Sequence, residues 1–500
     1  MSERVAVAGA GIAGLSCALA LGGRGFELTL YERDPPPPAQ REHASETALR
    51  RRGVPQAVHP HFFMGRLREA FRARHPELLE RLVAAGAGEG RFEDSLHPLA
   101  RSHYVPRRLD ASLTSIAARR TTFETVMRDY VCERGLARIE HGASAVGLSV
   151  EPGAAGAPAR VRGLRVERGG AREEISADVV IDASGRAGEL ARELRAHGVR
   201  LYEERHDSGI LYFTRHYELQ RGRAFPSAHG LPGLLFADFV VGALPADAGA
   251  FTVTYQVQRD DPELIAIVRE PEAFQALAMQ LPVIARWVAP EQARPTSEVF
   301  GFGQMDSFWR STLARGEPQV LGLYFAGDTA ARTNPRYGRG CTWSFVAAER
   351  LAETLLATRD PRERALRYER ALERALRADW RTMLAMDRAS RRRFEVAAGR
   401  RPARLPDRAR EALSTLLDEA QLADADFFRG IWAGYHGLTG MSAWLRDPRA
   451  WLGLARGALR RRRERGALGE RAQRPSRAQI LRTFPARAAN ESRCTSERTG

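Results

Sequence analysis

The chain has 500 residues, of which 44% are hydrophobic, and a formal net charge of +16. This length exceeds what one hydrophobic core usually supports, so we expect a cofactor-binding domain joined to a smaller substrate domain. No apolar run approaches the roughly 20 residues of a membrane-spanning helix, and the N-terminus enters a strand without a signal peptide. We therefore expect a cytoplasmic protein without a membrane span.

The positive charge consists entirely of arginine, because no lysine occurs in the chain. Residues 457–500 hold twelve arginines and four glutamates and so carry +8, half of the total. This tail contains the run RRRRER and lacks sustained apolar periodicity, which is typical of a solvated or disordered segment. The rest of the chain is only mildly basic, and we expect no binding to nucleic acid.

The N-terminal residues read as strand, glycine turn, helix and strand. An apolar run at 4–8 is followed by GAGIAG, by LSCALALGGRG with helical periodicity, and by FELTLYERD as a second strand. In this Rossmann order a pyrophosphate lies at the helix N-terminus, and an acidic residue after the second strand binds a ribose 2′-OH, which favours FAD or NAD over NADP. The predicted cofactor-binding residues of this unit are Gly9, Gly11, Ile12, Ala13, Gly14, Glu32 and Arg33.

The middle of the chain mixes helices and strands. Residues 53–104 contain a strongly helical stretch, and RRTTFETVMRDYVCE at 119–133 predicts an amphipathic helix. ISADVVIDASGR at 175–186 predicts a buried strand that ends in a turn. From 208 to 257 three alternating runs predict an antiparallel sheet, and the sequence after residue 358 is mostly helical.

A second glycine-rich element lies more than three hundred residues after the first. The buried strand QVLGLYFAGD ends in Asp328, and GDTAARTNPRYGRG then leads into a predicted helix at 341–358. The carboxyl ends of strands are where open α/β sheets bind ligands. Pro335, Gly338 and Gly340 would hold a loop whose backbone can approach a flat ring.

With these motifs the sequence resembles a large FAD-dependent family of aromatic hydroxylases, epoxidases, geranylgeranyl-type reductases and flavin-dependent halogenases. The resemblance covers residues 1–358 and implies FAD as the cofactor. By it, Asp328 binds the ribityl chain or the adjoining phosphate, and Pro335 to Gly340 lie along the isoalloxazine. RRTTFE resembles the family's R-x-x-L-E element, which implies Arg120 near the FAD phosphates with Glu124 as its structural partner.

The fold class implied is α/β: a Rossmann-type FAD-binding domain with an inserted antiparallel-sheet substrate domain and a helical C-terminal region. We expect the FAD-binding domain to be discontinuous, with part of 53–105 contributing to the substrate side. The predicted boundaries are 1–205 and 300–360 for the FAD-binding domain, 206–299 for the substrate domain, 361–456 for the helical region and 457–500 for a basic, disordered tail.

The electron donor depends on a third family element, usually an ADG turn, which reads DASG here with Ser184 in place of the acidic residue. We therefore expect either transient docking of NAD(P)H or a partner flavin reductase. The halogenases of the family use a lysine, which this chain lacks together with the WxWxIP signature. Of the activities of the family, oxygenation and hydride chemistry are therefore left. Among the oxygenating members, residues 56–87 and the run YFTRHY look most like a bacterial subgroup near the polyketide-polyene epoxidases.

The activity implied is an FAD-dependent monooxygenase that uses O2 and a flavin C4a-hydroperoxide to epoxidise or hydroxylate a largely apolar small molecule in secondary metabolism. An apolar cavity between the antiparallel sheet and the flavin would exclude water and orient the substrate. The alternatives are an FAD-dependent reductase of the geranylgeranyl-reductase type and a flavin-bearing assembly protein whose tail recruits a partner. The expected pocket residues are Tyr212, Thr214, His216 and Tyr255.

Histidines and cysteines give no sign of a metal site. The four cysteines lie far apart without a CxxC spacing, so we expect free thiols. His59 and His61 precede a helix near the expected flavin entrance, but no further ligand accompanies them. Cys341 adjoins the flavin loop, where we expect simple packing at the start of a helix rather than a covalent link.

Overall fold

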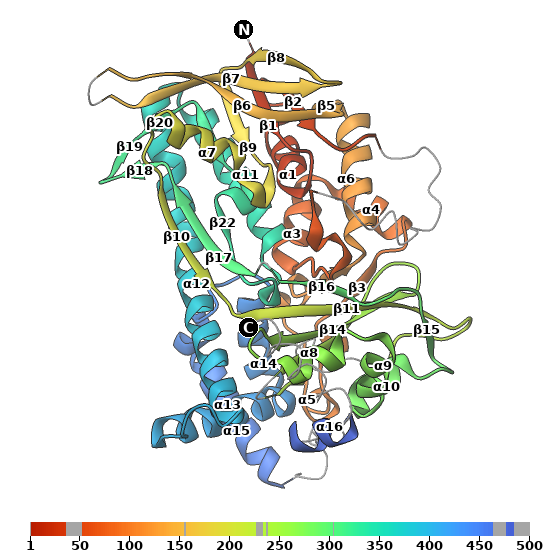
Figure 1. The fold of residues 1–500 in the computed structure, drawn as a ribbon. Coiled ribbons are helices and arrows are strands. Elements are labelled where there is room, and N and C mark those ends of the chain that lie inside the picture. Colours follow the sequence, from red (N-terminus) through yellow and green to blue (C-terminus); the bar gives the residue numbers. More distant parts are fainter. Residues whose placement is uncertain are drawn as a thin grey trace, which may run out of the picture.

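The structure, a computed structural model, describes residues 2–36, 53–154, 157–226, 234–236, 239–303, 305–463 and 477–484. It has a parallel sheet and one antiparallel sheet beside the N-terminus, further antiparallel sheets across the middle, and a group of helices at the opposite end (Figure 1). The predicted α/β class with antiparallel sheets and a helical C-terminal region is confirmed. Among the described helices, none combines the length and apolarity needed to cross a membrane.

The parallel sheet is built around the predicted N-terminal unit. Helix α1 (Ile12–Leu21) connects its first two strands, and β1 pairs in parallel with β2 on one side and β9 on the other. In spatial order the strands are β21 (Leu323–Phe325), β9 (Val179–Asp182), β1 (Glu3–Ala8), β2 (Phe26–Glu32) and β5 (Arg138–His141).

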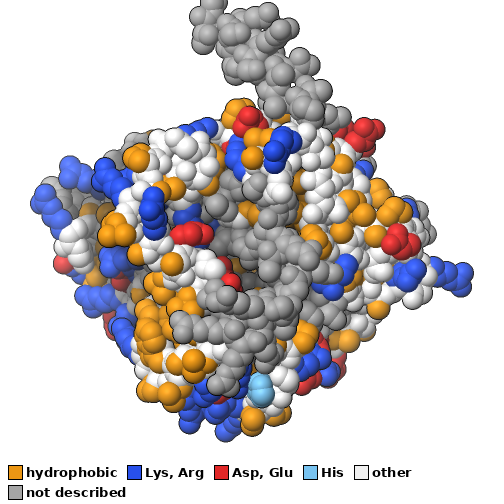
Figure 2. Space-filling model, turned by 90° about the horizontal axis from the view of Figure 1, so that it is seen from below, with side chains coloured by type: hydrophobic (Ala, Val, Ile, Leu, Met, Phe, Trp, Pro, Cys, Tyr) orange, Lys and Arg blue, Asp and Glu red, His pale blue; other side chains and the backbone are white. Residues whose placement is uncertain are grey.

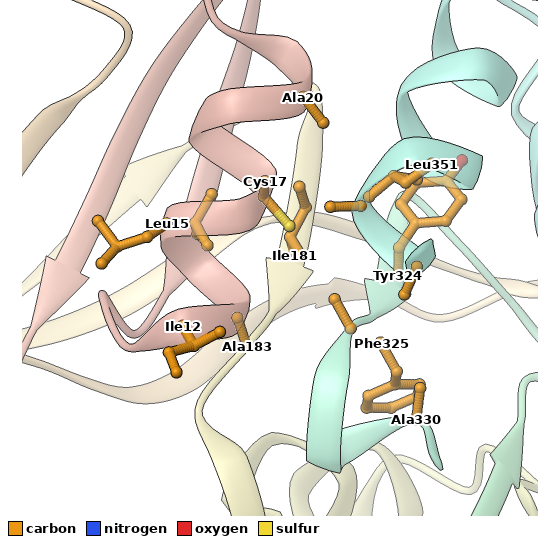
Figure 3. Close-up of a cluster of buried hydrophobic side chains, with 14 of the residues drawn as sticks. Ile12, Leu15, Cys17, Ala20, Ile181, Ala183, Tyr324, Phe325, Ala330 and Leu351 are labelled. Carbon is orange, nitrogen blue, oxygen red and sulfur yellow. The ribbon is translucent and has the colours of Figure 1, made fainter. Parts of the chain in front are cut away.

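Two helices and two strands far apart in the sequence share the core of this domain (Figure 3). Cys17 of α1 points toward Ile181 of β9, with Leu351 of α11 (Gly340–Ala357) beyond it, while Leu15 lies on the opposite side of α1. Each of these four side chains is fully buried. The helix at 340–357 matches the one predicted after the second glycine motif, so packing brings the two motifs together.

The strand predicted as QVLGLYFAGD is in fact two strands. Gly322 has φ +79°, and a Cβ there would lie 2.6 Å from the carbonyl oxygen of Val161, so only glycine fits this bend. The first part, β20 (Val320–Leu321), joins an antiparallel sheet, and β21 joins the parallel sheet. β20 pairs in parallel with β7 (Ala159–Arg168), which in turn pairs antiparallel with β6 (Ala143–Glu151) and β8 (Ala171–Ser176).

A second antiparallel sheet lies below the parallel one, and three helices cover its outer face (Figure 1). Its order is β12-β13-β14-β11, with β15 and β16 beyond β11, which confirms the sheet predicted from 208 to 257. The strands are β11 (Ile210–Leu219), β12 (Leu234–Leu235), β13 (Phe239–Pro245), β14 (Ala250–Gln258), β15 (Ala293–Pro295) and β16 (Phe300–Phe302). The covering helices are α8 (Pro262–Val268), α9 (Pro271–Met279) and α10 (Pro282–Val288).

A third sheet connects the two halves, and its strands are β10 (Tyr202–Asp207), β17 (Asp306–Ser311) and β22 (Ala331–Arg332). Residues 53–137, which precede β5, are mainly helical, as expected. Their elements are η1 (Pro55–Val58), α3 (Gly65–Arg74), α4 (Pro76–Ala84), α5 (Pro98–Arg101), η3 (Arg108–Ser112) and α6 (Arg120–Glu133), with the short strands β3 (Gly88–Gly90) and β4 (Ser115–Ala117).

The predicted helical region begins with α12 (Pro361–Ala397), which runs along one side of the molecule (Figure 1). It continues through α13 (Leu405–Ala423), α14 (Ala425–Tyr435), η7 (Ala443–Arg446) and α15 (Pro448–Arg463). Seen from this end, patches of hydrophobic side chains lie among the arginines (Figure 2). The large apolar side chains that α13, η7 and α15 leave exposed are Leu405, Leu413, Leu445, Trp451, Leu452 and Leu459.

The tail differs from its prediction where it is described. Residues 477–483 form helix α16, whose Ile480 is fully buried against the core under the second antiparallel sheet. Arg477 donates to Asp261 at 2.7 Å and to Glu263 at 2.7 Å. The prediction of a disordered tail was wrong for this segment, because one turn of apolar side chains and a paired arginine suffice to dock a short helix. The rest of 464–500 lies outside the described residues.

Candidate active site

One large cavity, of about 980 Å³, lies between the parallel sheet and the second antiparallel sheet. At one end it is lined by Gly11, which lies in the turn after β1, and by Glu32, the last residue of β2. At the other end it is lined by Thr254 and Gln256 of β14. Between them lie residues of the second glycine motif, so every predicted cofactor segment faces the same space.

The three motif glycines have different roles. Gly9 has φ +100°, and a Cβ there would lie 2.8 Å from the carbonyl oxygen of Ala183. A Cβ on Gly14 would lie 2.0 Å from the carbonyl oxygen of Gly9, so its absence lets α1 start close to the turn. By contrast, a Cβ on Gly11 would meet only Glu124 Oε1 at 3.9 Å and would point into the cavity. Ile12 and Ala13 also line the cavity.

The predicted ribose contact lies at the end of β2. Glu32 is only 5% exposed, and it accepts hydrogen bonds from the backbone amides of Ala10 at 2.9 Å and Asp34 at 3.0 Å. These bonds fix the carboxylate beside the turn, at the wall of the cavity. Arg33 is exposed and also lines the cavity.

Arg120 begins α6 and lines the cavity beside Gly11. It forms the predicted ion pair with Glu124, one helical turn away, at 2.7 Å, and both side chains are nearly buried. Its Nη1 lies 3.2 Å from His61 Nε2. Burial, and then the nearby Arg120 charge, lowers the pKa of His61 to about 3, so this ring is neutral and accepts from the guanidinium.

The second glycine motif forms the middle of the cavity wall. Asp328 lies in η5 (Gly327–Thr329), with Oδ2 4.0 Å from Arg186 Nε. Pro335 begins η6 (Pro335–Tyr337), and Gly338 follows with φ +61°, where a Cβ would lie 2.7 Å from Met64 Cε. Gly340 then opens α11, so the N-terminus of an 18-residue helix faces the cavity.

The DASG turn follows β9 beside this loop. Asp182 is fully buried and accepts from the Ser184 amide at 3.0 Å and from its hydroxyl at 2.6 Å. Burial raises the pKa of Asp182, although these hydrogen bonds oppose the rise. Ser184 also lines the cavity, so a neutral hydroxyl stands where the resembling family carries a carboxylate.

The four expected pocket residues divide into three groups. Tyr212 lines the cavity, and its hydroxyl donates to Asn334 Oδ1 at 3.4 Å. Thr214 and His216 share its face of β11 but are buried behind the cavity wall; His216 Nε2 donates to the carbonyl of Val58 at 2.8 Å. Tyr255 was wrongly predicted, because it points to the opposite face of the sheet and packs edge-on against Phe274.

The alternation along β14 explains this error, since Thr254 and Gln256 flank Tyr255 and are the residues that face the cavity. The antiparallel register pairs Tyr212 with Gln256 and Thr214 with Thr254. Each strand alone shows a period of two but not which face is inner, so the sequence did not single out these two residues. The sequence pointed to His59 but suggested no role for it, and in the structure this residue lines the cavity.

Two further expectations concern metals and thiols. In the part of the chain that the structure describes, no group of three or more His, Cys, Asp or Glu side chains could hold a metal ion. Cys341 lies at the start of α11, at the cavity wall. Burial raises its pKa to about 12, so its thiol is protonated and a poor nucleophile.

No protein-family model and no curated protein matches the chain. Solved structures do. A flavoprotein/dehydrogenase from Cytophaga hutchinsonii has a TM-score of 0.59 at 13% identity, over 93% of this chain and 100% of that one. The flavin-dependent halogenase CmlS has a TM-score of 0.55 at 18% identity, and the match covers 93% of this chain and 78% of that one. The anhydrotetracycline hydroxylase OxyS from Streptomyces rimosus has a TM-score of 0.54 at 16% identity, and the match covers 88% of this chain and 76% of that one. The chain therefore has the fold of the flavin-dependent monooxygenases and halogenases, as its two glycine motifs predicted.

Proposed function

We propose that the protein is an FAD-dependent monooxygenase that hydroxylates or epoxidises a largely apolar small molecule. The observation that carries the proposal is the single cavity that joins the Gly11 turn, the Pro335 to Gly340 loop and the face of β14. A dinucleotide site and a substrate site in one continuous cavity are what a flavin enzyme needs, because the ring must contact the substrate directly.

The residues present fit FAD. The open space at Gly11 and the N-terminus of α1 suit a pyrophosphate, since unpaired amides and the helix dipole favour an anion there. The fixed Glu32 carboxylate suits a ribose hydroxyl. Arg120 would neutralise phosphate charge, Asp328 would bind the ribityl chain, and the Pro335 to Gly340 loop would lie along the ring.

The contribution of the protein is to orient the substrate and to exclude water. Bound flavin would supply the redox chemistry, taking electrons from a donor and passing them to O2. The sheet side of the cavity is lined by the apolar groups Phe236, Val240 and Phe302. Such a wall would hold an apolar substrate against the loop and keep bulk water away from the reacting atoms.

The electron donor in this proposal is NAD(P)H or a partner flavin reductase. Ser184 supports a transient or indirect donor, because it offers a neutral hydroxyl rather than a carboxylate beside the cavity. We do not propose halogenation, since the chain has no lysine to carry a halogenating species. The proposed setting in secondary metabolism rests on the sequence resemblance alone.

The experiment is to purify the protein, release and identify its flavin, and then follow flavin reduction and reoxidation with NADH, NADPH or an added reductase. A monooxygenase consumes O2 in proportion to product and does not turn over without it. Anaerobic turnover on isolated double bonds would instead support a reductase. A protein that stays colourless after reconstitution with FAD would contradict both.

A further inference from the structure

The sheet wall of the cavity carries a line of polar groups. Antiparallel pairing of β11 and β14 places Thr214 opposite Thr254 and Tyr212 opposite Gln256 on one face. The two threonine hydroxyls are 2.8 Å apart, so they are hydrogen-bonded across the strands. Both strands of this wall therefore present hydroxyl or amide groups next to the apolar ones.

His59 lies over this line of polar groups. Its Nδ1 is 2.8 Å from the Thr214 hydroxyl, and its ring lies 5.3 Å from the ring of Phe302 and 6.2 Å edge-on from that of Tyr212. These contacts fix the ring on the substrate side of the cavity. The side chain is only 6% exposed, yet the residue lines the cavity.

The other ring nitrogen of His59 lacks a hydrogen-bond partner in the part of the chain that the structure describes. Nε2 is buried, and no donor or acceptor among the described residues is within hydrogen-bond reach of it. A buried polar atom without a hydrogen bond costs free energy, and native proteins rarely leave one. Gln256 Oε1, on the same wall, is likewise buried and without a partner in the described part of the chain.

His61 provides the contrast two residues later. Its Nδ1 bonds to the carbonyl of His59 at 2.9 Å and its Nε2 to Arg120 at 3.2 Å. Both nitrogens of His61 are thus used inside the protein, on the side of the glycine turn. Both histidines line the cavity, but of the two only His59 keeps a ring nitrogen without a hydrogen-bond partner among the described residues.

We propose that His59 Nε2 is a substrate-positioning contact that hydrogen-bonds a hydroxyl group of the substrate, with Thr214 and Thr254 holding its ring. This inference rests on the proposed function and names a feature of its substrate: an apolar body that carries a hydroxyl near the flavin loop. Gln256 Oε1 is the second contact of that hydroxyl.

The protonation state of His59 supports a neutral contact. Burial, and then the neighbouring His216 and His61, lowers the pKa of His59 to about 3. In the neutral ring one nitrogen donates and the other accepts. If Thr214 donates to Nδ1, then Nε2–H donates to the substrate; if Nδ1–H donates to Thr214, then Nε2 accepts. A hydroxyl satisfies either arrangement, because it can both donate and accept.

The test uses the FAD-loaded full chain and two probes of similar shape, 2-naphthol and 2-methylnaphthalene, with affinities measured by calorimetry. We expect the wild type to prefer 2-naphthol about tenfold, the usual worth of a hydrogen bond to a buried partner. His59→Phe should retain the affinity for 2-methylnaphthalene and lose the preference. Thr214→Val should lose part of the preference for 2-naphthol. His59→Gln keeps a polar atom at this position and should therefore retain part of the preference that His59→Phe loses. His103→Phe, at an exposed histidine outside the cavity, is the control.

A preference that persists in His59→Phe would overturn the inference, as would a wild type without a preference or an equal loss of both affinities. Thr214→Val and His59→Gln decide the matter if His59→Phe fails to fold. Flavin content, read from the absorbance spectrum, separates the two levels of the argument. A chain that holds no flavin contradicts the proposed function, whereas a flavin-loaded chain without a preference contradicts only the role of His59.

Discussion

The carbonyl oxygen of Gly9 lies only 2.0 Å from the place that a Cβ on Gly14 would take. The contact is between backbone and side chain, so neither partner can rotate away. We expect Gly14→Ala to shift the start of α1 and to lower the free energy of unfolding by about 1–3 kcal/mol, the usual cost of overpacking. Urea unfolding followed by circular dichroism measures this. Gly23→Ala, beside the same helix in open space but at φ +71°, gives the cost of strain without a clash.

Gly11 is expected to behave differently from Gly14, because its missing side chain faces the cavity. Gly11→Leu should leave the unfolding midpoint nearly unchanged and abolish flavin retention, since the side chain would occupy the place of the pyrophosphate. Flavin absorbance after gel filtration reports retention, and thermal unfolding of the flavin-free protein reports stability. Stoichiometric FAD in Gly11→Leu would show that the turn is not the cradle.

The pair Arg120–Glu124 should contribute to stability as a unit, because both side chains are nearly buried. Arg120→Met removes the guanidinium that pairs with the buried Glu124 carboxylate and should cost about 3–5 kcal/mol. The double variant Arg120→Met/Glu124→Leu should recover most of that loss, since it buries no charge. A double-mutant cycle in urea gives the coupling energy, and additive single effects would rule out a strong pair.

Lowering the pH should destabilise the protein already at pH values well above the pKa values of ordinary carboxylates. Burial above all lowers the pKa of His59, His61 and His436 to about 3 from 6.5. Between about pH 6.5 and 3 the unfolded state therefore binds protons that the folded state does not, and stability falls as the pH falls. Each histidine adds up to about 1.4 kcal/mol per pH unit to that slope.

His436→Gln tests this contribution, because His436 is fully buried and accepts from the Gly65 amide at 3.0 Å. Losing the ring lowers stability at every pH, but the slope between pH 4.5 and 5.5 should decrease by about 1.4 kcal/mol per pH unit. His103→Gln, at an exposed position, should leave the slope unchanged. Parallel curves for the wild type and His436→Gln would mean that the buried ring already binds a proton near pH 6.

Helix α16 should stabilise the substrate side through one side chain. Ile480→Ala removes a fully buried residue from the core under the antiparallel sheet and should cost about 2–5 kcal/mol. Leu459→Ala, at a position 58% exposed, should change stability by less than about 0.5 kcal/mol. Equal effects of the two substitutions would show that α16 does not dock in solution.

The local elements were predictable where one pattern carried both structure and chemistry. The run from the first strand to Glu32 combines strand period, helix period and glycine turn, and all of its elements appear in that order. Tyr255 was misplaced because a period of two does not tell which face of β14 is inner. That choice is made by the pairing with β11 and by the helices on the outer face, which the local sequence does not encode.

The bend at Gly322 and the docking of α16 were missed for a related reason. Residues 320–326 of QVLGLYFAGD are apolar apart from Gly322, and this glycine is the one local sign that the run divides between two sheets. Ile480 packs together with Leu481 and Phe484 in a segment rich in arginine. The average composition of the whole tail hides these few apolar residues. In both cases the conformation depends on residues far away in the sequence: Gly322 bends beside Val161, and Ile480 packs into the core that α8 to α10 form.

Among the described residues, Arg477 and Ala478 of α16 are the last in the sequence to line the cavity. During synthesis they leave the ribosome after every other lining residue, so the glycine cradle and the loop at Pro335 to Gly340 exist before this wall does. The order of translation thus completes this side of the cavity after the others.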